Sequence, residues 1–166
     1  NNDGCIIARS NESKNLGIKM GEPAFKIKHI IEKYNVNVFS TNFALYGDLS
    51  RRVMNTFRTE VDEIEVYSID EAFLDLSNLS DRDRCLQIKN KVQKWTGIPI
   101  SIGVAKTKTL AKVANHIAKK YTKKGVFIFD DEDLVRRALK FLPVEDLWGV
   151  GRKIAKRLNG FGIYTA

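Results

Sequence analysis

The order of hydrophobic patterns between residues 43 and 128 limits the possible folds more than any other feature of the sequence. Helical spacing, with apolar residues three or four positions apart, alternates there with short runs of strand formers, in the order helix, strand, strand, helix, strand, helix, strand. The helical stripes are Leu45, Leu49, Val53 and Phe57; Cys85, Ile88, Val92 and Trp95; and Leu110, Val113, Ala114, Ile117 and Tyr121. The alternation predicts an α+β fold, in which one mixed β-sheet has helices packed on one face.

The two flanking regions have different patterns. Residues 1–42 are short, glycine-punctuated segments, for which we expect strands at 5–8 and 36–40, a short helix ended by Gly17 and a helix after Pro23. Residues 129–166 contain no strand pattern and predict a helix opened by acids, followed by a short helix, a glycine hairpin and a further helix. Within the middle region, Asp81 or Ser80 is expected to cap the helix that follows.

Charge points to a polyanionic partner. The 166 residues carry a formal net charge of +8, and the stretch from Val104 to Lys124 holds seven lysines and no acid. Cys5 and Cys85 lack metal-ligand spacing and are expected to be free, buried thiols. No apolar run approaches a membrane span, so we expect a cytoplasmic protein without membrane contact.

Two adjacent acids, Asp70 and Glu71, interrupt the strand-forming stretch VYSIDEAFLDL. Successive side chains of a straight strand point to opposite faces, so these carboxylates converge only if the chain turns between two strands. A hairpin corner at residues 68–71, with the polar Ser68 near it, would bring them together, and a hard divalent cation such as Mg²⁺ or Mn²⁺ would relieve their repulsion. The alternative is a surface turn with two solvated acids.

Basic residues supply two further signals. Lys108, Lys112 and Lys119 lie away from the apolar stripe of their predicted helix, where they form either a phosphate clamp or a solvated face. The segment WGVGRKIAKRL places Gly149 and Gly151 in a tight turn before a helix that begins with Arg152 and Lys153. This arrangement is typical of a helix–hairpin–helix that binds the nucleic-acid backbone, although a plain turn is the alternative.

Several of these motifs together resemble the Y-family, or translesion, DNA polymerases. The resemblance is carried in chain order by NNDGCIIARSNESKNLGIKMGEP, YSIDEAFLDLS, IGVAKTKTLAKVANHIAKK and LPVEDLWGVGRKIAKRL, and the first of these is most similar to the UmuC branch, the catalytic subunits of SOS mutagenic polymerases. It implies a polymerase right hand, with fingers at 1–42, an incomplete palm at 43–128 and the start of a helical thumb at 129–166. The implied function is error-prone, template-directed DNA synthesis in DNA repair and damage tolerance.

The resemblance also implies roles for individual residues. Asp70 and Glu71 would be catalytic ligands of two Mg²⁺ ions, Asp70 bridging both and Glu71 holding the ion that activates the primer hydroxyl, with Mn²⁺ as a possible substitute. Lys119 would contact the incoming deoxynucleoside triphosphate. At the family's finger positions this chain has Ala8, Asn11 and Lys14, of which Lys14 alone keeps a charge, and Arg9 is a candidate replacement.

Some family features have no counterpart in these residues. The family's first palm strand carries another metal-binding aspartate and the sugar-selecting residue, and a little finger follows the thumb. We therefore expect this chain to be a fragment that is inactive by itself. Primer–template DNA is the expected substrate, and a UmuD-type subunit and a sliding clamp are expected partners through regions outside these residues.

Two other functions fit parts of the pattern. A palm-type nucleotidyl cyclase would use paired carboxylates and two metal ions, but it has no use for a DNA-binding hairpin. A non-catalytic DNA-binding module would use the helix–hairpin–helix and the basic face without the acids. Turnover of ATP without DNA distinguishes the first of these functions from a polymerase, and the effect of Asp70→Ala on DNA synthesis distinguishes the second.

Overall fold

A computed structural model describes residues 4–76 and 81–166 of the chain. The chain divides into two compact units, Asn1–Leu45 and Tyr46–Ala166. Among the described residues, no helix combines the length and the apolar character needed to cross a membrane. The expected cap Ser80 lies outside the described residues, whereas the Asp81 side chain does accept a hydrogen bond from the backbone N–H of Arg84 and begins the helix there.

The first unit is built from short helices: α1 (Asn11–Asn15), the 3₁₀ helix η1 (Ala24–Ile27) and α2 (Lys28–Lys33). Gly17 follows α1 in the left-handed region, with φ of 83°, as expected for a helix stop. The two strands predicted in this region are wrong, because residues 36–40 are irregular and Cys5 forms only an isolated bridge with Pro23. Strand preference is expressed only where a partner strand is present, and the described part of this unit contains none.

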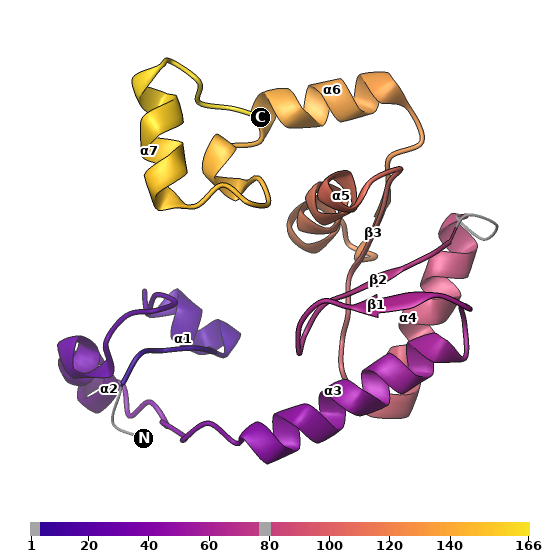
Figure 1. Ribbon diagram of the computed structural model, residues 1–166. Helices are drawn as coiled ribbons and strands as arrows, with labels where there is room; N and C mark the ends of the chain where they lie inside the picture. Colours follow the sequence, from indigo (N-terminus) through magenta and orange to yellow (C-terminus); the bar gives the residue numbers. More distant parts are fainter. Residues whose placement is uncertain (1–3, 77–80) are drawn as a thin grey trace. The chain divides into compact units, whose positions relative to one another are not determined.

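The second unit alternates helices and strands along the chain (Figure 1). Its elements are α3 (Phe43–Arg58), which begins just before the unit boundary, β1 (Ile64–Val66), β2 (Ala72–Leu74), α4 (Arg82–Thr96), β3 (Ile102–Val104), α5 (Lys108–Tyr121), β4 (Val126–Ile128), α6 (Glu132–Phe141), the 3₁₀ helix η2 (Val144–Asp146) and α7 (Arg152–Gly160). The order from α3 to β4 is the predicted one.

Four strands form two short ladders. β1 pairs antiparallel with β2, with Ile64 opposite Leu74, and β3 pairs parallel with β4, with Ile102 opposite Val126. Both orientations of a mixed sheet are therefore present, but in the described residues the ladders are two separate two-stranded sheets and not one continuous sheet. The ladders are nonetheless joined through packing, because side chains from both lie against one apolar cluster on α3 and α4. That cluster consists of Val53, Met54, Phe57, Ile88 and Val92.

Helix α5 is the parallel crossover between β3 and β4, and it packs very closely on β3 (Figure 1). A Cβ atom built on Gly103 would lie 2.0 Å from the backbone nitrogen of Asn115, so this contact requires glycine. A second apolar cluster joins the buried face of α5, through Val113 and Ala114, to Phe129 and Leu142. This cluster attaches α6 and the segment that follows it to the rest of the second unit.

The apolar stripes predicted the buried middle of the helices but not all of their ends. Leu45, in the first turn of α3, is 48% exposed, although Phe57 in the last turn of the same helix is buried. Cys85, Ile88 and Val92 are fully buried, whereas Trp95 is 58% exposed and Tyr121 is 75% exposed. Each of these aromatic residues lies in the final turn of its helix, beyond the elements that cover the earlier turns. A helical period places residues on a common face, but it does not show how far along the helix the neighbouring layer extends.

The cysteines are only partly as predicted. Both Cys5 and Cys85 are free, but Cys5 is exposed and Cys85 is fully buried. Burial, followed by the nearby negative charge of Asp81, raises the pKa of the Cys85 thiol. Cys85 therefore serves as a small apolar core residue and not as a reactive group.

Candidate nucleic-acid and metal site

The adjacent acids lie in the connection between β1 and β2. The backbone N–H groups of Tyr67 and Ser68 both donate to the carbonyl oxygen of Glu71, each at 3.0 Å, and close the turn. The predicted hairpin corner is therefore confirmed. The Ser68 hydroxyl donates to Oδ1 of Asp70 at 2.7 Å, which leaves the exposed Asp70 carboxylate bound to a neutral group.

Glu71 has a charged partner on α5. Nζ of Lys112 lies 2.8 Å from Oε2 and 3.0 Å from Oε1 of Glu71, so the ammonium contacts both carboxylate oxygens. The Lys112 side chain is 23% exposed and that of Glu71 is 40% exposed. The repulsion expected between neighbouring carboxylates is thus offset on one of them by a lysine from a different element.

Lysines follow one face of α5 at helical spacing. Lys108, one turn before Lys112, pairs with Glu65 of β1 and lies over the ring of Phe73, 5.4 Å from its centroid. Lys119 is exposed near the end of the same helix. The alternative of a purely solvated lysine face is therefore wrong for Lys108 and Lys112, whose ammonium groups have defined partners.

His116 is half-buried on α5, and burial has the largest effect on its ionisation. Burial lowers the pKa of His116, and the positive charges of Lys120 and Lys119 lower it further. The negative charge of Asp146 raises the pKa and offsets part of this effect. The imidazole is therefore neutral at pH 7, and it stands among lysines without a positive charge of its own.

An aromatic cluster joins the acidic hairpin to the C-terminal helices. The indole Nε1–H of Trp148 donates to the hydroxyl oxygen of Tyr67 at 3.2 Å, and the two rings meet edge to face with centroids 5.4 Å apart. Phe73 completes the cluster, 5.8 Å from Tyr67 and 5.7 Å from Trp148. Trp148 lies immediately before Gly149, so the loop of the glycine hairpin is held against the strand pair that carries the acids.

The glycine hairpin has the predicted form. Gly149 has φ of 91°, a conformation that favours glycine, and Gly151 is the N-cap of α7 without a side-chain hydrogen bond to the helix. Because Gly151 has no side chain, it cannot accept a hydrogen bond from the first backbone N–H groups of α7. Arg152 and Lys153 are exposed on the first turn, while Ala155 is buried beneath them.

Two predicted nucleotide-binding residues belong to the first unit. Lys14 is exposed on α1, with Nζ 3.1 Å from the Asn11 side-chain oxygen. Arg9 is half-buried and donates from Nη1 to the carbonyl oxygen of Ile18 at 2.8 Å, while its Nε is buried without a hydrogen-bond partner. Arg9 thus braces the turn around buried Ile18, which favours a structural role for it over the predicted contact with a triphosphate.

No described region gathers three or more histidine, cysteine, aspartate or glutamate side chains in a metal-binding arrangement. Asp70 and Glu71, adjacent in the β1–β2 turn, would supply two carboxylates to a cation bound there. Such a set fits Mg²⁺ or Mn²⁺, because Mg²⁺ is commonly bound through one or two carboxylates together with substrate phosphates and water.

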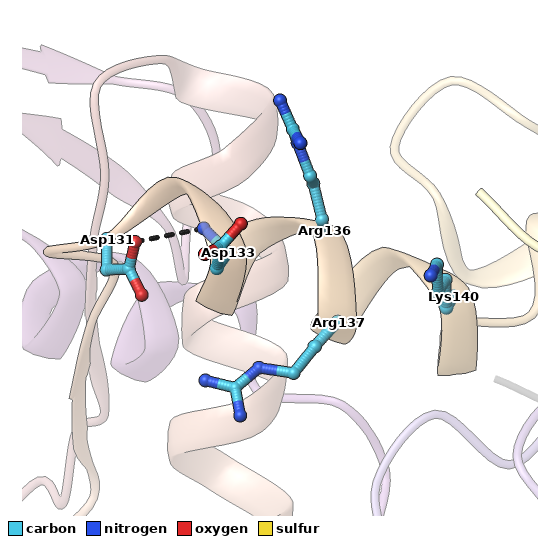
Figure 2. A pocket seen from close by; sticks show the side chains of 5 residues that line it. All are labelled: Asp131, Asp133, Arg136, Arg137 and Lys140. Carbon is cyan, nitrogen blue, oxygen red and sulfur yellow. Dashed lines mark hydrogen bonds between the residues drawn. The ribbon is translucent and has the colours of Figure 1, made fainter.

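A surface hollow on α6 lies apart from the predicted site residues. It is lined by Asp131, Asp133, Arg136, Arg137 and Lys140, all from one helix and its cap. Figure 2 shows Arg136 and Arg137 extending to opposite sides of the helix, and the Asp131 carboxylate accepting the cap hydrogen bond from the N–H of Asp133 at 3.0 Å. Because its walls are side chains of a single helix and its cap, the hollow offers no enclosed site.

Sequence reasoning did not identify the role of Tyr67, Phe73 and Trp148, nor the pairing of Lys112 with Glu71. A tryptophan directly before a glycine hairpin was the available signal, because large aromatic residues in such loops usually pack onto something. The partner itself could not be read from the sequence, since Tyr67 and Trp148 are 81 positions apart.

Comparisons with known proteins agree over the whole chain. The model of the impB/mucB/samB family matches residues 1–116, and the model of the IMS family HHH motif matches residues 133–163. Protein UmuC of Salmonella typhimurium is 49% identical over 100% of this chain and 41% of its own length. DNA polymerase IV of Saccharolobus solfataricus is 33% identical over 96% of this chain and 45% of its own length.

Solved structures show the same likeness. An insertion ternary complex of Dbh DNA polymerase superimposes with a TM-score of 0.79 at 31% identity, over 94% of this chain and 45% of that one. A chimeric Y-family DNA polymerase superimposes with a TM-score of 0.81 at 29% identity, over 98% of this chain and 47% of that one. The chain thus spans less than half the length of the relatives it matches.

Proposed function

Because this chain belongs to the impB/mucB/samB family, the UmuC branch of the Y-family DNA polymerases, we propose that it supplies the acidic hairpin and the DNA-binding hairpin of an error-prone translesion polymerase. The observation that carries the proposal is the junction of three features in the second unit. The acids of the β1–β2 turn, the lysine face of α5 and the glycine hairpin before α7 are connected by direct side-chain contacts.

The proposed reaction is template-directed transfer of a deoxynucleotide to a primer 3′ hydroxyl. Asp70 and Glu71 would hold two Mg²⁺ ions, and Mn²⁺ would be able to replace them. Bound cations would supply Lewis-acid activation of the hydroxyl and stabilisation of the pyrophosphate leaving group. Among the described residues, the role of the chain is to hold the two carboxylates at one corner, Asp70 through Ser68 and Glu71 through Lys112.

Phosphate binding is assigned to the basic residues. Lys119 is proposed to contact the triphosphate, and its exposure on a helix with several lysines and no acid supports this role. Lys14 remains a proposed triphosphate contact, and Arg9 is the weaker candidate because its guanidinium already binds the Ile18 carbonyl. Gly149 and Gly151, with Arg152 and Lys153, would grip the DNA backbone at the start of α7, where unpaired N–H groups favour phosphate oxygens.

Domain roles follow from the same proposal. Residues 1–42 would act as fingers, 43–128 as palm and 129–166 as the start of the thumb. Primer–template DNA and a deoxynucleoside triphosphate are the proposed substrates, and the similar Dbh DNA polymerase was solved as an insertion ternary complex. A UmuD-type subunit and a sliding clamp stay predicted partners.

The test is primer extension by the complete protein in which this sequence occurs, with Mg²⁺ or Mn²⁺. We expect Asp70→Ala to abolish synthesis while DNA binding, measured by fluorescence anisotropy, changes little. Asp62→Ala is the matched control, since it removes an exposed acid close in sequence but outside the hairpin. Synthesis that survives Asp70→Ala would contradict the assignment of Asp70 as a catalytic metal ligand. DNA binding by the unaltered protein without any synthesis would favour a non-catalytic DNA-binding module. Conversion of ATP without DNA would favour a cyclase.

A further inference from the structure

Lys112 is unlike an ordinary surface lysine. Its ammonium is within hydrogen-bond distance of both oxygens of the Glu71 carboxylate, at 2.8 and 3.0 Å. Those oxygens provide the lone pairs that a metal ion would need. A cation that binds Glu71 must therefore share the carboxylate with Lys112 or displace it.

Aromatic rings hold the same ammonium from its other sides. Nζ of Lys112 lies 4.8 Å from the ring centroid of Tyr67 and 5.3 Å from that of Trp148, both within the range of a cation–π interaction. The Tyr67 and Trp148 rings are in turn fixed by their hydrogen bond. The position of Lys112 is thus defined by three groups and not by the ion pair alone.

The two acids of the hairpin consequently differ in availability. Asp70 is exposed and receives a hydrogen bond from the uncharged Ser68, so an incoming cation meets an uncompensated carboxylate there. Glu71 already has a positive partner. In this form of the protein, the charge of one acid is neutralised before any divalent cation arrives.

We propose that Lys112 is an internal counter-cation of Glu71, which holds this carboxylate in position beside Asp70 and is displaced from it when a divalent cation binds. The inference rests on the proposed function insofar as Glu71 is taken to be a metal ligand. Lys112 is then a positioning residue. It lowers the affinity of the site for metal because it competes for Glu71, and it keeps the Glu71 carboxylate in place before the metal binds. The rings of Tyr67 and Trp148 keep the Lys112 ammonium close to the site after a metal ion has displaced it from Glu71.

The experiment measures cation affinity without using catalysis. Tb³⁺ is a hard cation that binds carboxylate oxygens, and its emission is sensitised by energy transfer from tryptophan and tyrosine nearby. Trp148 and Tyr67 surround Lys112, so sensitised emission reports binding at the hairpin. Titration of the complete protein with Tb³⁺, followed by displacement with Mg²⁺ or Mn²⁺, gives the affinity of each ion, and Trp148→Phe identifies the part of the signal that arises here.

We expect Lys112→Met to tighten cation binding by about three- to fivefold, the size expected for loss of a competing, partly exposed ion pair. Lys108→Met is the matched control, because it removes an equal charge one helical turn away that pairs with Glu65 and not with Glu71. Its effect should be less than about twofold. Lys112→Arg, which keeps the charge, should stay close to the unaltered protein.

Each other outcome overturns the inference in a recognisable way. Equal tightening by Lys112→Met and Lys108→Met would show a general charge effect, and unchanged or weaker binding in Lys112→Met would show that the lysine does not compete. In both cases Glu71→Gln would still weaken Tb³⁺ binding, and the proposed metal role of Glu71 would stand. If Glu71→Gln leaves Tb³⁺ binding unchanged, the metal role of Glu71 and the inference fail together.

Discussion

The hydrogen bond between Trp148 and Tyr67 should be measurable as a coupling energy that links the glycine hairpin to the acidic hairpin. Trp148→Phe removes the indole N–H and Tyr67→Phe removes the hydroxyl, while both variants keep an aromatic ring in the cluster. Each single substitution breaks the same 3.2 Å hydrogen bond, and the double variant has no further hydrogen bond of this pair to lose.

The expected magnitude follows from the geometry. A neutral hydrogen bond contributes about 0.5–1.5 kcal/mol to the free energy of unfolding, and this one belongs at the lower end because Tyr67 is 47% exposed. We therefore expect each single variant to lose about 0.5–1 kcal/mol and the double variant to lose no more than the larger single loss. Trp148→Ala also removes an edge-to-face contact with Tyr67, a tilted ring contact with Phe73 and one cation–π contact, and it should cost about 2–3 kcal/mol.

Urea unfolding followed by far-UV circular dichroism supplies the four free energies of the cycle, since helix signal is independent of the substituted chromophores. The same four proteins should then be tested for DNA affinity. Strictly additive losses in Trp148→Phe and Tyr67→Phe would mean that the two residues do not interact, and the proposed link between the two hairpins would be withdrawn.

Two further predictions concern the framework that holds the site. The Glu60 side chain is 7% exposed. Burial raises the pKa of Glu60, but the hydrogen bond and charge of Lys91 and the charge of Arg84 outweigh burial and lower this pKa. Glu60→Gln should therefore cost about 1–2 kcal/mol at pH 7. The stabilisation by ionised Glu60 is fully present above the unfolded-state pKa of this group and disappears as pH falls through its lowered folded-state pKa. If Glu60→Gln lowers the free energy of unfolding in urea equally at pH 7 and pH 2, this prediction is wrong. Gly103→Ala should lower the free energy of unfolding by about 3 kcal/mol or more, because the new methyl group meets the backbone of α5. Gly47→Ala is the control and should not destabilise the protein, since no atom lies within 4 Å of the added methyl group. Equal thermal midpoints for the two variants would refute the close packing of α5 on β3.

Local sequence was sufficient for the parts of the fold that depend on neighbouring residues. The stripe through Val53 and Phe57 predicted α3, and the acids between two strand patterns predicted the corner at residues 68–71. Glycines at 149 and 151 predicted the turn before α7, and Gly149 has a positive φ that few other residues tolerate. These features have short-range causes, namely periodicity, capping and backbone sterics, and they can be read in a window of a few residues.

Residues 36–40 show where local reasoning fails. Their composition favours a strand, yet the described part of the first unit offers them no partner, and a strand is stable only when its hydrogen bonds are paired. Trp95 fails for a related reason, because its place on the apolar face of α4 does not ensure that another element reaches it. In both cases the deciding neighbour is absent from the local sequence.

The sequence by itself determined which chemistry the chain can offer: paired carboxylates, a lysine-rich helix and a glycine hairpin with basic residues. Tertiary structure alone decided how those groups are used. It placed Lys112 on Glu71 across 41 positions and Trp148 on Tyr67 across 81, contacts that no periodicity encodes. The physical reason is that side-chain pairing depends on how separate elements pack in space, and the close approach of α5 to β3 and the shared apolar clusters set that packing.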